Sequence, residues 1–376
     1  MKKRWGRILM LALGLCMMTA CGTEKKNAEE GGTVQSVATT DREQAVVGTE
    51  QKKDEAASEK KEEPVQATTT VKEEPATTAA VVKEPLLTPS GKAEDMIEVK
   101  ENSYYEGEKY VMYFHKGAKV PGNIAVKTEE IMKELEELYG MTYGDHGYRN
   151  PGAWREEYFG GGYDGLNPDH AKLDILIVPD MNDGEIEWAD RGVVMLFDAD
   201  YDEENTGYKT VSHELSHLLR MDQSLFLGQI IEEGVGVYSE DKFSRKAGYP
   251  NWDLIQYVNT HGFGEVYDAS PMEKDAEKTF REVNVQERSA EQAHYHYGVR
   301  LVTFLQETYG QDAAKRLSET ARKYTFGEKD NDTIVKILKE TFGEDVFKKF
   351  EEWLPKGWGR WCDEYLEYMK PYGLEY

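Results

Sequence analysis

The run His213-Glu214-Leu215-Ser216-His217 limits what this chain can fold into more than any other feature of its 376 residues. Histidines four positions apart lie on one face of an α-helix, so His213 and His217 can turn two imidazole nitrogens toward one metal ion. Glu214 lies one step round the helix, where its carboxylate can reach a water molecule beside that ion. The flanking apolar residues recur at helical intervals. The sequence therefore predicts a helix over 208–220 that presents a metal site.

Such a site needs one more protein ligand, because catalytic zinc takes three protein ligands and keeps a fourth position open. The metzincin pattern would place a Gly and a His three and six positions after His217. Arg220 and Gln223 stand there instead, so the third ligand must come from a later helix. The H-E-x-x-H spacing alone also arises by chance, which makes this third ligand the decisive prediction.

Glu232 and Glu233 are the candidates, within the run 230–238. On a helix, Glu233 shares a face with Ile230 and Val237, whereas Glu232 shares one with small and polar residues. A carboxylate in an apolar stripe is costly to bury unless it meets a cation, and zinc would supply one. Glu233 is therefore the predicted ligand, and a buried salt bridge is the alternative.

The order of these residues resembles the gluzincin pattern of the peptidase MA clan, which includes aminopeptidase N-type enzymes. In that pattern H-E-x-x-H is followed on the next helix by Glu-Gly-x-Ala-x-Tyr, and Glu233, Gly236 and Tyr238 stand at the Glu, Ala and Tyr positions. The resemblance implies a zincin-like α+β fold, in which a small sheet and helix precede a mostly helical C-terminal half. It also implies that Glu233 is the third ligand of one zinc ion per chain.

A Tyr-x-x-Gly sequence opens a later helix in the same family, and Tyr295-His296-Tyr297-Gly298 resembles it. The resemblance implies that the Tyr295 hydroxyl supports the oxyanion that forms during hydrolysis. A phenol can donate such a hydrogen bond, and donors of this kind act strongly where water is scarce. His294, His296 and Tyr297 remain alternatives for this role, as does a purely structural aromatic cluster.

These residues together predict zinc-dependent hydrolysis of peptide bonds in a peptide or protein substrate. The predicted metal ligands are His213, His217 and Glu233, with Glu214 as general base and Tyr295 as hydrogen-bond donor. One alternative is a cell-surface lipoprotein that retains zinc and binds peptide or glycan without hydrolysing it. Another is a metal-free structural lipoprotein.

One departure from the resembled family bears on the mode of cleavage. Its aminopeptidases carry Gly-x-Met-Glu-Asn on the strand before the zinc helix, where the Glu holds the free amine of the substrate. The run 192–198 contains no such glutamate. This favours an endopeptidase, with an edge strand that pairs with the extended backbone of the substrate.

The N-terminus resembles a bacterial lipoprotein signal. Basic residues precede the apolar stretch 8–20 and Cys21, and such peptides are cut before the cysteine, which is then acylated. We therefore expect 1–20 to be a signal peptide and Cys21 to carry the lipid, including palmitate, that holds the domain outside the bacterial cell membrane. An uncleaved anchor is the alternative, although the stretch is shorter than a spanning helix needs. Loss of Cys16 and lipidation of Cys21 would leave Cys362 without a disulfide partner.

Composition sets the domain boundaries. Residues 21–94 are predicted to be a solvated tether, because the chain contains no Phe, Trp or Tyr from Gly22 to Leu87 and is rich in Glu, Lys, Thr and Pro. The metallopeptidase domain then occupies 95–376, which we expect to be monomeric. The net charge of -25 excludes nucleic acid as a partner, since phosphate binding needs clustered Lys and Arg.

Periodicity divides the domain into a sheet-bearing part (95–206), the zinc-binding helices (207–241) and a helical part (242–376). The acidic run that includes Asp198 and Asp200 is predicted to be a solvated turn, with a calcium loop as the weaker alternative. Strands are predicted at 109–115, 173–178 and 192–197, and helices at 126–139, 225–241, 252–260, 292–309, 312–324 and 332–342.

Overall fold

The computed structural model of the protein describes residues 86–144, 153–160, 162–163, 165–168, 171–179, 187–190, 192–201, 207–220, 227–258, 268–284, 291–324 and 330–375. All of them belong to one structural unit of the chain. The predicted signal peptide, Cys21 and most of the predicted tether lie outside the described residues. Leu86 pairs with Tyr104 in an isolated bridge and Leu87 is buried. The chain therefore contacts the sheet before residue 95, where composition placed the start of the domain.

A five-stranded sheet forms the sheet-bearing part, with the strand order β2-β3-β5-β7-β6. Strands β3, β5 and β7 are parallel, whereas the edge strands β2 and β6 run antiparallel to their neighbours. Strands β1 and β4 form a separate antiparallel pair. The strands are β1 (Met96–Glu98), β2 (Ser103–Glu106), β3 (Tyr110–Phe114), β4 (Lys119–Pro121), β5 (Leu173–Val178), β6 (Trp188–Asp190) and β7 (Val193–Phe197).

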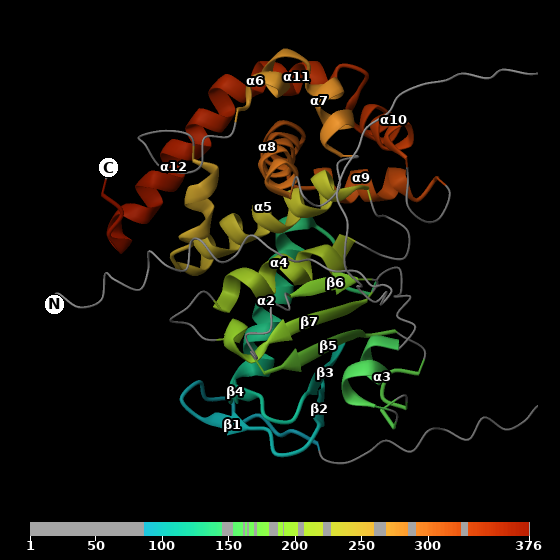
Figure 1. Ribbon diagram of the computed structural model, residues 1–376, viewed down its shortest axis with the longest axis vertical. Coiled ribbons are helices and arrows are strands. Elements are labelled where there is room, and N and C mark those ends of the chain that lie inside the picture. Colours follow the sequence, from blue (N-terminus) through green and yellow to red (C-terminus); the bar gives the residue numbers. More distant parts are fainter. Residues whose placement is uncertain are drawn as a thin grey trace, which may run out of the picture. The chain divides into compact units, whose positions relative to one another are not determined.

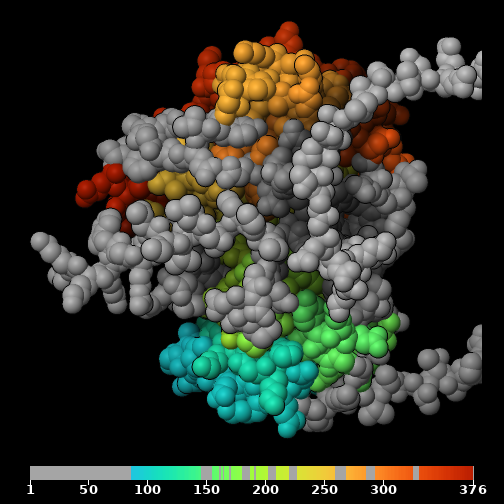
Figure 2. All heavy atoms as spheres, viewed as in Figure 1, coloured from blue at the N-terminus to red at the C-terminus, as the bar shows by residue number. Residues whose placement is uncertain are grey.

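Helices make up most of the remaining described chain (Figure 1). Figure 2 shows the same division on the surface, with blue and green sheet-bearing residues at one end and orange and red C-terminal helices at the other. The helices are α2 (Ile124–Tyr139), α3 (Ala153–Phe159), α4 (Gly207–Arg220), α5 (Gln229–Ala247), α6 (Ser270–Lys274), α7 (Ala276–Val283), α8 (Glu291–Tyr309), α9 (Ala313–Ala321), α10 (Asn331–Phe342), α11 (Val346–Trp353) and α12 (Gly359–Met369), with shorter helical turns η1 (Asp198–Tyr201), η2 (Asp253–Tyr257), η4 (Leu354–Trp358) and η5 (Lys370–Tyr372).

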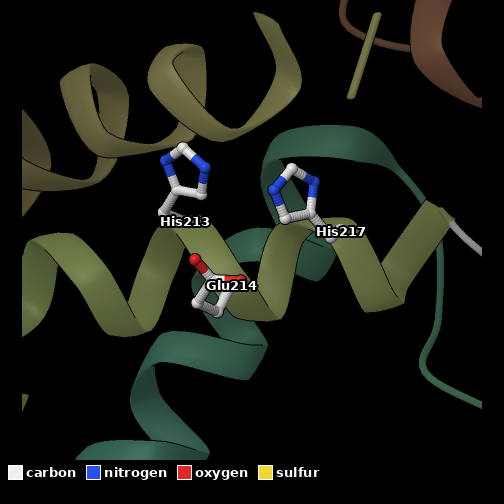
Figure 3. Close-up of side chains that lie close together, drawn as sticks. All are labelled: His213, Glu214 and His217. Carbon is white, nitrogen blue, oxygen red and sulfur yellow. The ribbon is translucent and has the colours of Figure 1, made fainter. Parts of the chain in front are cut away.

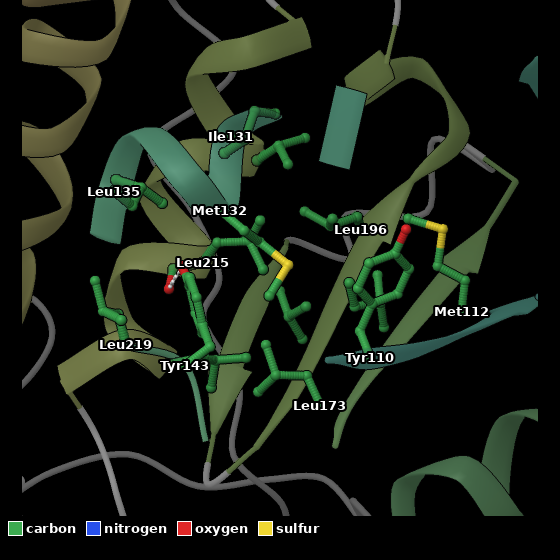
Figure 4. Close-up of a cluster of buried hydrophobic side chains, with 14 of the residues drawn as sticks. Tyr110, Met112, Ile131, Met132, Leu135, Tyr143, Leu173, Leu196, Leu215 and Leu219 are labelled. Carbon is green, nitrogen blue, oxygen red and sulfur yellow. Dashed lines mark hydrogen bonds between the residues drawn. The ribbon is translucent and has the colours of Figure 1, made fainter. Parts of the chain in front are cut away.

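Both faces of the central strands are buried, as is typical of parallel strands covered on each side. Successive side chains of a strand point to opposite faces, so each strand contributes to two cores. Tyr110, Leu173 and Leu196 belong to the core shared with α2 and α4, which Figure 4 shows. Tyr113 and Leu176 belong to a second core on the other face, to which Phe159 at the end of α3 also contributes.

Helices α5 and α8 cross closely at two glycines. A Cβ atom on Gly234 would lie 2.4 Å from the carbonyl oxygen of Gly298, and one on Gly298 would lie 2.3 Å from the carbonyl oxygen of Ile230. Real Cβ atoms essentially never approach another atom within 3.0 Å. Only glycine therefore lets the two backbones lie this close together.

The predicted α+β architecture is confirmed, because a small sheet with helices precedes a mostly helical half. The strands predicted at 109–115, 173–178 and 192–197 are β3, β5 and β7. Of the helix predicted at 252–260, the described residues 252–258 form only the 3-10 turn η2. Strands β2 and β6 and helix α3 were not predicted, since segments of three to seven residues show too little periodicity.

Two further observations concern the predicted export of the chain. Cys362 is buried and forms no disulfide with another residue that the structure describes. Among the helices that the structure describes, none combines the length and the apolar character that crossing a membrane requires.

Replacement of Gly234 by alanine should destabilise the protein by about 1–3 kcal/mol, because the new methyl group would force α5 and α8 apart. The free energy of unfolding in urea measures the effect. Gly359→Ala is the matched control, since a Cβ atom at this helical glycine meets nothing within 4 Å. That variant should stay within about 1 kcal/mol of the original protein. Equal stability of the two variants would contradict the close crossing.

Candidate metal centre

Helix α4 separates the apolar core from a polar site. Val211 and Leu215 pack in the core against the sheet, because they recur at the spacing of one helix face. The hydroxyl of Tyr143, just after α2, donates a hydrogen bond of 2.8 Å to the carbonyl oxygen of Leu215 and holds the helix on this core. His213 and His217 project together from another side of α4 (Figure 3).

The three polar residues of the H-E-x-x-H motif form a compact group. His213, Glu214 and His217 are buried, and one ligand atom from each lies within 4.8 Å of the others. Glu233 approaches from α5, with its Oε2 atom 3.3 Å from Nε2 of His213. Tetrahedral zinc with bonds of about 2.0–2.1 Å would hold two such donors roughly 3.3–3.4 Å apart. The spacing of this pair therefore fits this ion, and the structure places Glu233 beside His213 of the motif.

Glu240, also on α5, holds the other side of the His213 ring. Its Oε1 atom lies 2.5 Å from Nδ1 of His213, and both side chains are buried. A histidine that binds a metal commonly donates its second ring N–H to a carboxylate, which fixes the tautomer and the ring orientation. Nε2 of His213 is thereby left to face Glu233. The sequence analysis missed Glu240, although its spacing of seven residues from Glu233 indicates the same helix face.

Gly236 provides the space that the His213 ring occupies. A Cβ atom at this position would lie 2.3 Å from Nε2 of His213. Gly234, two residues earlier, contacts Gly298 on α8 instead.

The structure corrects the reason for choosing Glu233 over Glu232. Glu232 is the more buried of the two, with 1% of its surface exposed, and its Oε1 atom accepts a hydrogen bond of 2.9 Å from the N–H of Leu227. Glu233 keeps 19% of its side-chain surface exposed and faces His213. A backbone N–H just before α5 thus hydrogen-bonds the glutamate that is deepest in this helix.

Tyr295 on α8 reaches the same group. Its ring centroid lies 6.4 Å from that of His213, and burial and the charge of Glu233 raise the pKa of its hydroxyl. The three alternative donors have other partners: Tyr297 donates to the Ala276 carbonyl oxygen at 2.6 Å, His294 lies 2.7 Å from the Val283 carbonyl oxygen, and His296 lies 3.2 Å from a guanidinium nitrogen of Arg300. Of these four residues, Tyr295 is the one that contacts the predicted ligands.

Burial sets the protonation of Glu214. Burial raises the pKa of its carboxyl group to about 8, His213 opposes this change, and the charges of Glu233, Glu187 and Glu240 reinforce it. A carboxyl group with this pKa exchanges its proton near neutral pH, which suits a general base.

Glu233 carries the negative charge that attracts a cation to the group. Burial would raise its pKa, but the hydrogen bond to His213, the charge of His217 and the hydrogen bond from Tyr295 lower the pKa below its ordinary value. For His213, burial lowers the pKa, yet the hydrogen bonds to Glu233 and Glu240 raise it well above the ordinary value. Glu233 is thus ionised, and its negative charge favours a positive charge on the neighbouring His213 ring.

A second pair of carboxyl groups adjoins Glu214. The charge of Glu187, just before β6, acts on the carboxyl group of Asp200 in η1. Burial and the charge of Glu187 raise the pKa of Asp200 to about 8, although the N–H of Phe197 donates to its Oδ2 atom at 2.7 Å. The solvated turn predicted for Asp200 is therefore wrong, because this side chain is buried. Residues 202–204 of the acidic run lie outside the described residues.

The strand that directly precedes α4 is not at the edge of the sheet. β7 lies between β5 and β6 and pairs with both. The edge on this side is β6, which the sequence analysis missed, and Glu187 stands at its start. The chain turns back at Gly192, between the short segments that form β6 and β7. A glycine between two such segments is a signal of a β-hairpin, and it indicates this edge.

No protein-family model and no curated protein sequence matches the chain. Similar solved structures include an M1 zinc metallopeptidase from Deinococcus radiodurans, at 13% sequence identity and a TM-score of 0.38, with coverage of 69% of this chain and 51% of that chain. The catalytic module of the metalloprotease ZmpA from Clostridium perfringens is similar at 12% identity and a TM-score of 0.32, with coverage of 70% and 48%. A functionally unknown conserved protein from Bacillus anthracis is similar at 11% identity and a TM-score of 0.31, with coverage of 73% and 52%. The chain thus spans about half the length of these proteins. Similarities this distant do not decide function, which depends on the residues of the site.

The carboxyl group of Asp200 should make stability depend on pH. Its pKa rises from 3.8 to about 8 on folding, so its contribution is complete below about pH 4 and is lost as the pH rises to 8, by at most about 1.4 kcal/mol per pH unit. Asp200→Asn keeps a neutral group of the same shape, and its free energy of unfolding should decline less between pH 5 and pH 8. Asp198→Asn, in the same turn, is the control and should follow the original protein. Parallel pH profiles for all three proteins would refute the assignment.

Proposed function

We propose that the protein is a zinc-dependent peptidase, with one ion held by His213, His217 and Glu233. The observation that carries the proposal is the 3.3 Å spacing of Nε2 of His213 and Oε2 of Glu233, with Nδ1 of His213 held by Glu240. A structural salt bridge would account for Glu233 and His213 alone. It would not account for a second histidine on the same face with a buried carboxyl group beside it.

Glu214 is the general base in this proposal. Its pKa of about 8 lets it accept a proton from the attacking water and return a proton to the departing amine near neutral pH. Bound zinc would polarise the substrate carbonyl and make that water more acidic. The burial of Glu214 and both histidines also limits access of bulk water, which strengthens electrostatic interactions at the reacting atoms.

Tyr295 supplies the hydrogen-bond donor. Burial and the neighbouring Glu233 charge raise its pKa well above the ordinary value, so the hydroxyl stays protonated. In the structure this hydroxyl is close enough to Glu233 to feel its negative charge. Turned toward a substrate, the same donor would stabilise the carbonyl oxygen as negative charge develops on it.

The first candidate for the mode of cleavage is an endopeptidase. Among the described strands, β6 ends the sheet on the side of Glu187. The outer edge of such a strand can pair with an extended peptide backbone, which can continue past the site in both directions.

An aminopeptidase is the second candidate, and the position of Glu187 favours it. Its charge acts on the carboxyl group of Glu214, so it lies close to the proposed general base. A carboxylate at the start of the edge strand can bind the terminal ammonium group of a peptide. The absence of a glutamate from 192–198 is therefore no longer a reason to favour an endopeptidase.

The proposal extends to location. The basic residues and apolar stretch before Cys21 support a lipid anchor at this cysteine, in the bacterial cell membrane. The domain would then act outside the cytoplasm, at the length of the polar tether from the membrane surface.

Glu214→Gln and Glu233→Gln should separate chemistry from metal binding. The first variant should keep zinc but lose about 10²–10⁴-fold in the turnover of fluorescent casein, because it removes only the base. The second should lose zinc as well, because it removes a ligand. Elemental analysis and casein hydrolysis measure the two effects, with the exposed Glu130→Gln as control.

Two outcomes would contradict this assignment. Retained hydrolysis in Glu214→Gln would eliminate the proposed base. A zinc-loaded original protein that cleaves neither casein nor peptides would favour the binding lipoprotein instead.

Peptides that are identical except for N-terminal acetylation distinguish the two modes of cleavage. An endopeptidase should cleave both at internal bonds, and Glu187→Gln should change neither rate much. An aminopeptidase should cleave only the free-amine peptide, and Glu187→Gln should raise KM for it by about tenfold, since an ammonium–carboxylate hydrogen bond contributes roughly 1.5–3 kcal/mol. Mass spectrometry identifies the products, and Glu106→Gln at the opposite sheet edge is the control.

A further inference from the structure

Three consecutive polar residues of α5 are buried, namely Ser239, Glu240 and Asp241. Consecutive side chains of an α-helix point about 100° apart, so these three leave α5 in three different directions. A buried polar side chain is costly unless it forms a hydrogen bond. Each of the three therefore needs a partner on its own side of the helix.

The first two residues meet partners on helices that precede α5 in the chain. Oγ of Ser239 lies 2.6 Å from the hydroxyl oxygen of Tyr139, at the end of α2. Oε1 of Glu240 lies 2.5 Å from Nδ1 of His213 on α4. Because residues 239 and 240 are neighbours on one rigid helix, a rotation of α5 about its axis would disturb both contacts at once.

Asp241 is held from the C-terminal helix α12. Its Oδ2 atom accepts a hydrogen bond of 3.1 Å from the indole Nε1 of Trp361, and its Oδ1 atom accepts one of 2.6 Å from Nε of Arg245. Arg245 belongs to α5 itself, whereas Trp361 joins Asp241 to another helix. Both Asp241 and Trp361 are 1% exposed, so water competes little for this bond.

An aromatic stack holds the ring of Trp361 in place. The ring of Trp358 lies almost parallel to it on one side, with centroids 4.3 Å apart and an interplanar angle of 11°. Tyr365 lies almost parallel on its other side, at 5.7 Å and 7°. The guanidinium group of Arg300 on α8 lies 4.4 Å from the centroid of the Trp358 ring, which is a favourable cation–π contact. The Trp361 N–H thus approaches α5 from a fixed position.

We propose that Trp361 is a positioning residue of the metal centre, which acts through α5 on His213. Its bond to Asp241 and the contact of Ser239 with α2 lie on opposite sides of Glu240, so together they fix the rotation of α5 about its axis. Glu240 is thereby held against Nδ1 of the His213 ring. The inference rests on the proposed function, because the direction of the other ring nitrogen matters for a metal that His213 binds.

Trp358 provides a matched control for Trp361. It belongs to the same stack and is also buried, yet its Nε1 atom forms no hydrogen bond within the part of the chain that the structure describes. Phenylalanine at either position removes the same atoms from the stack, but of the two changes Trp361→Phe is the one that breaks a bond to α5. A difference between these variants therefore measures the hydrogen bond and not the loss of aromatic surface.

Zinc affinity of the full-length chain tests the proposal, measured by competition with a chromophoric chelator. Trp361→Phe should weaken binding by about tenfold, the lower end of the range for groups that orient metal ligands. Trp358→Phe should leave the affinity unchanged. Glu240→Gln should weaken binding further than Trp361→Phe, and the double variant should match Glu240→Gln alone, because both changes break one chain of interactions.

Tyr139→Phe provides a second variant, so that the test does not depend on the folding of Trp361→Phe. It releases Ser239 on the other side of Glu240, and it should weaken zinc binding as well. Far-ultraviolet circular dichroism checks that each variant is folded under the conditions of the affinity measurement.

Another measurement uses the metal-free protein and so does not depend on zinc binding. The ¹⁵N resonance of His213 Nδ1 should shift in Trp361→Phe and stay in place in Trp358→Phe. Unchanged zinc affinity in Trp361→Phe, equal losses in the two tryptophan variants, or losses that add in the double variant would each overturn the inference while the proposed function stands. An original protein that binds no zinc would overturn the proposed function, and an unshifted His213 resonance would then overturn the inference separately.

Discussion

The contact between the His213 ring and helix α5 is the constraint on which the rest of the site depends. Glu240 holds one ring nitrogen, Glu233 faces the other, and Gly236 provides the space for the ring. All three come from one helix, so their relative positions follow from helical spacing alone. The position of α5 thereby sets the orientation of the His213 ring, and with it the geometry of the proposed metal ligands.

The rest of the fold serves to place α4 and α5 against each other. The hydroxyl of Tyr143 holds α4 at the Leu215 carbonyl oxygen, and the hydroxyl of Tyr139 contacts α5 at the Val235 carbonyl oxygen and at Ser239. Both tyrosines stand at or just after the end of α2, which lies on the sheet. Buried polar bonds of this kind specify a geometry more narrowly than apolar packing does. The sheet thus supports the site through one helix that contacts both ligand-bearing helices.

The sequence predicted the parts of the structure that depend on local spacing. The helix of His213 and His217 and the long buried strands follow from periodicity, and the resemblance pointed to Glu233 and Tyr295. Glu240 and Glu187 were missed for a different reason. Glu240 matters through its contact with His213, which is distant in sequence, and Glu187 adjoins a strand of only three residues. Neither feature leaves a periodic pattern in the sequence. The burial of Asp200 was mispredicted because acidic runs are usually solvated, and only the fold shows that its carboxyl group is buried near the charge of Glu187.

The shortness of β6 limits how a polypeptide can be recognised. Three residues of strand extend about 10 Å, since each residue adds roughly 3.3 Å. Main-chain pairing along this border can thus align only two or three residues of a guest chain, whatever their side chains. In the proposed peptidase, selectivity for particular amino acids would then depend on the surfaces on either side of the cut bond, where shape and charge decide which neighbours are accepted.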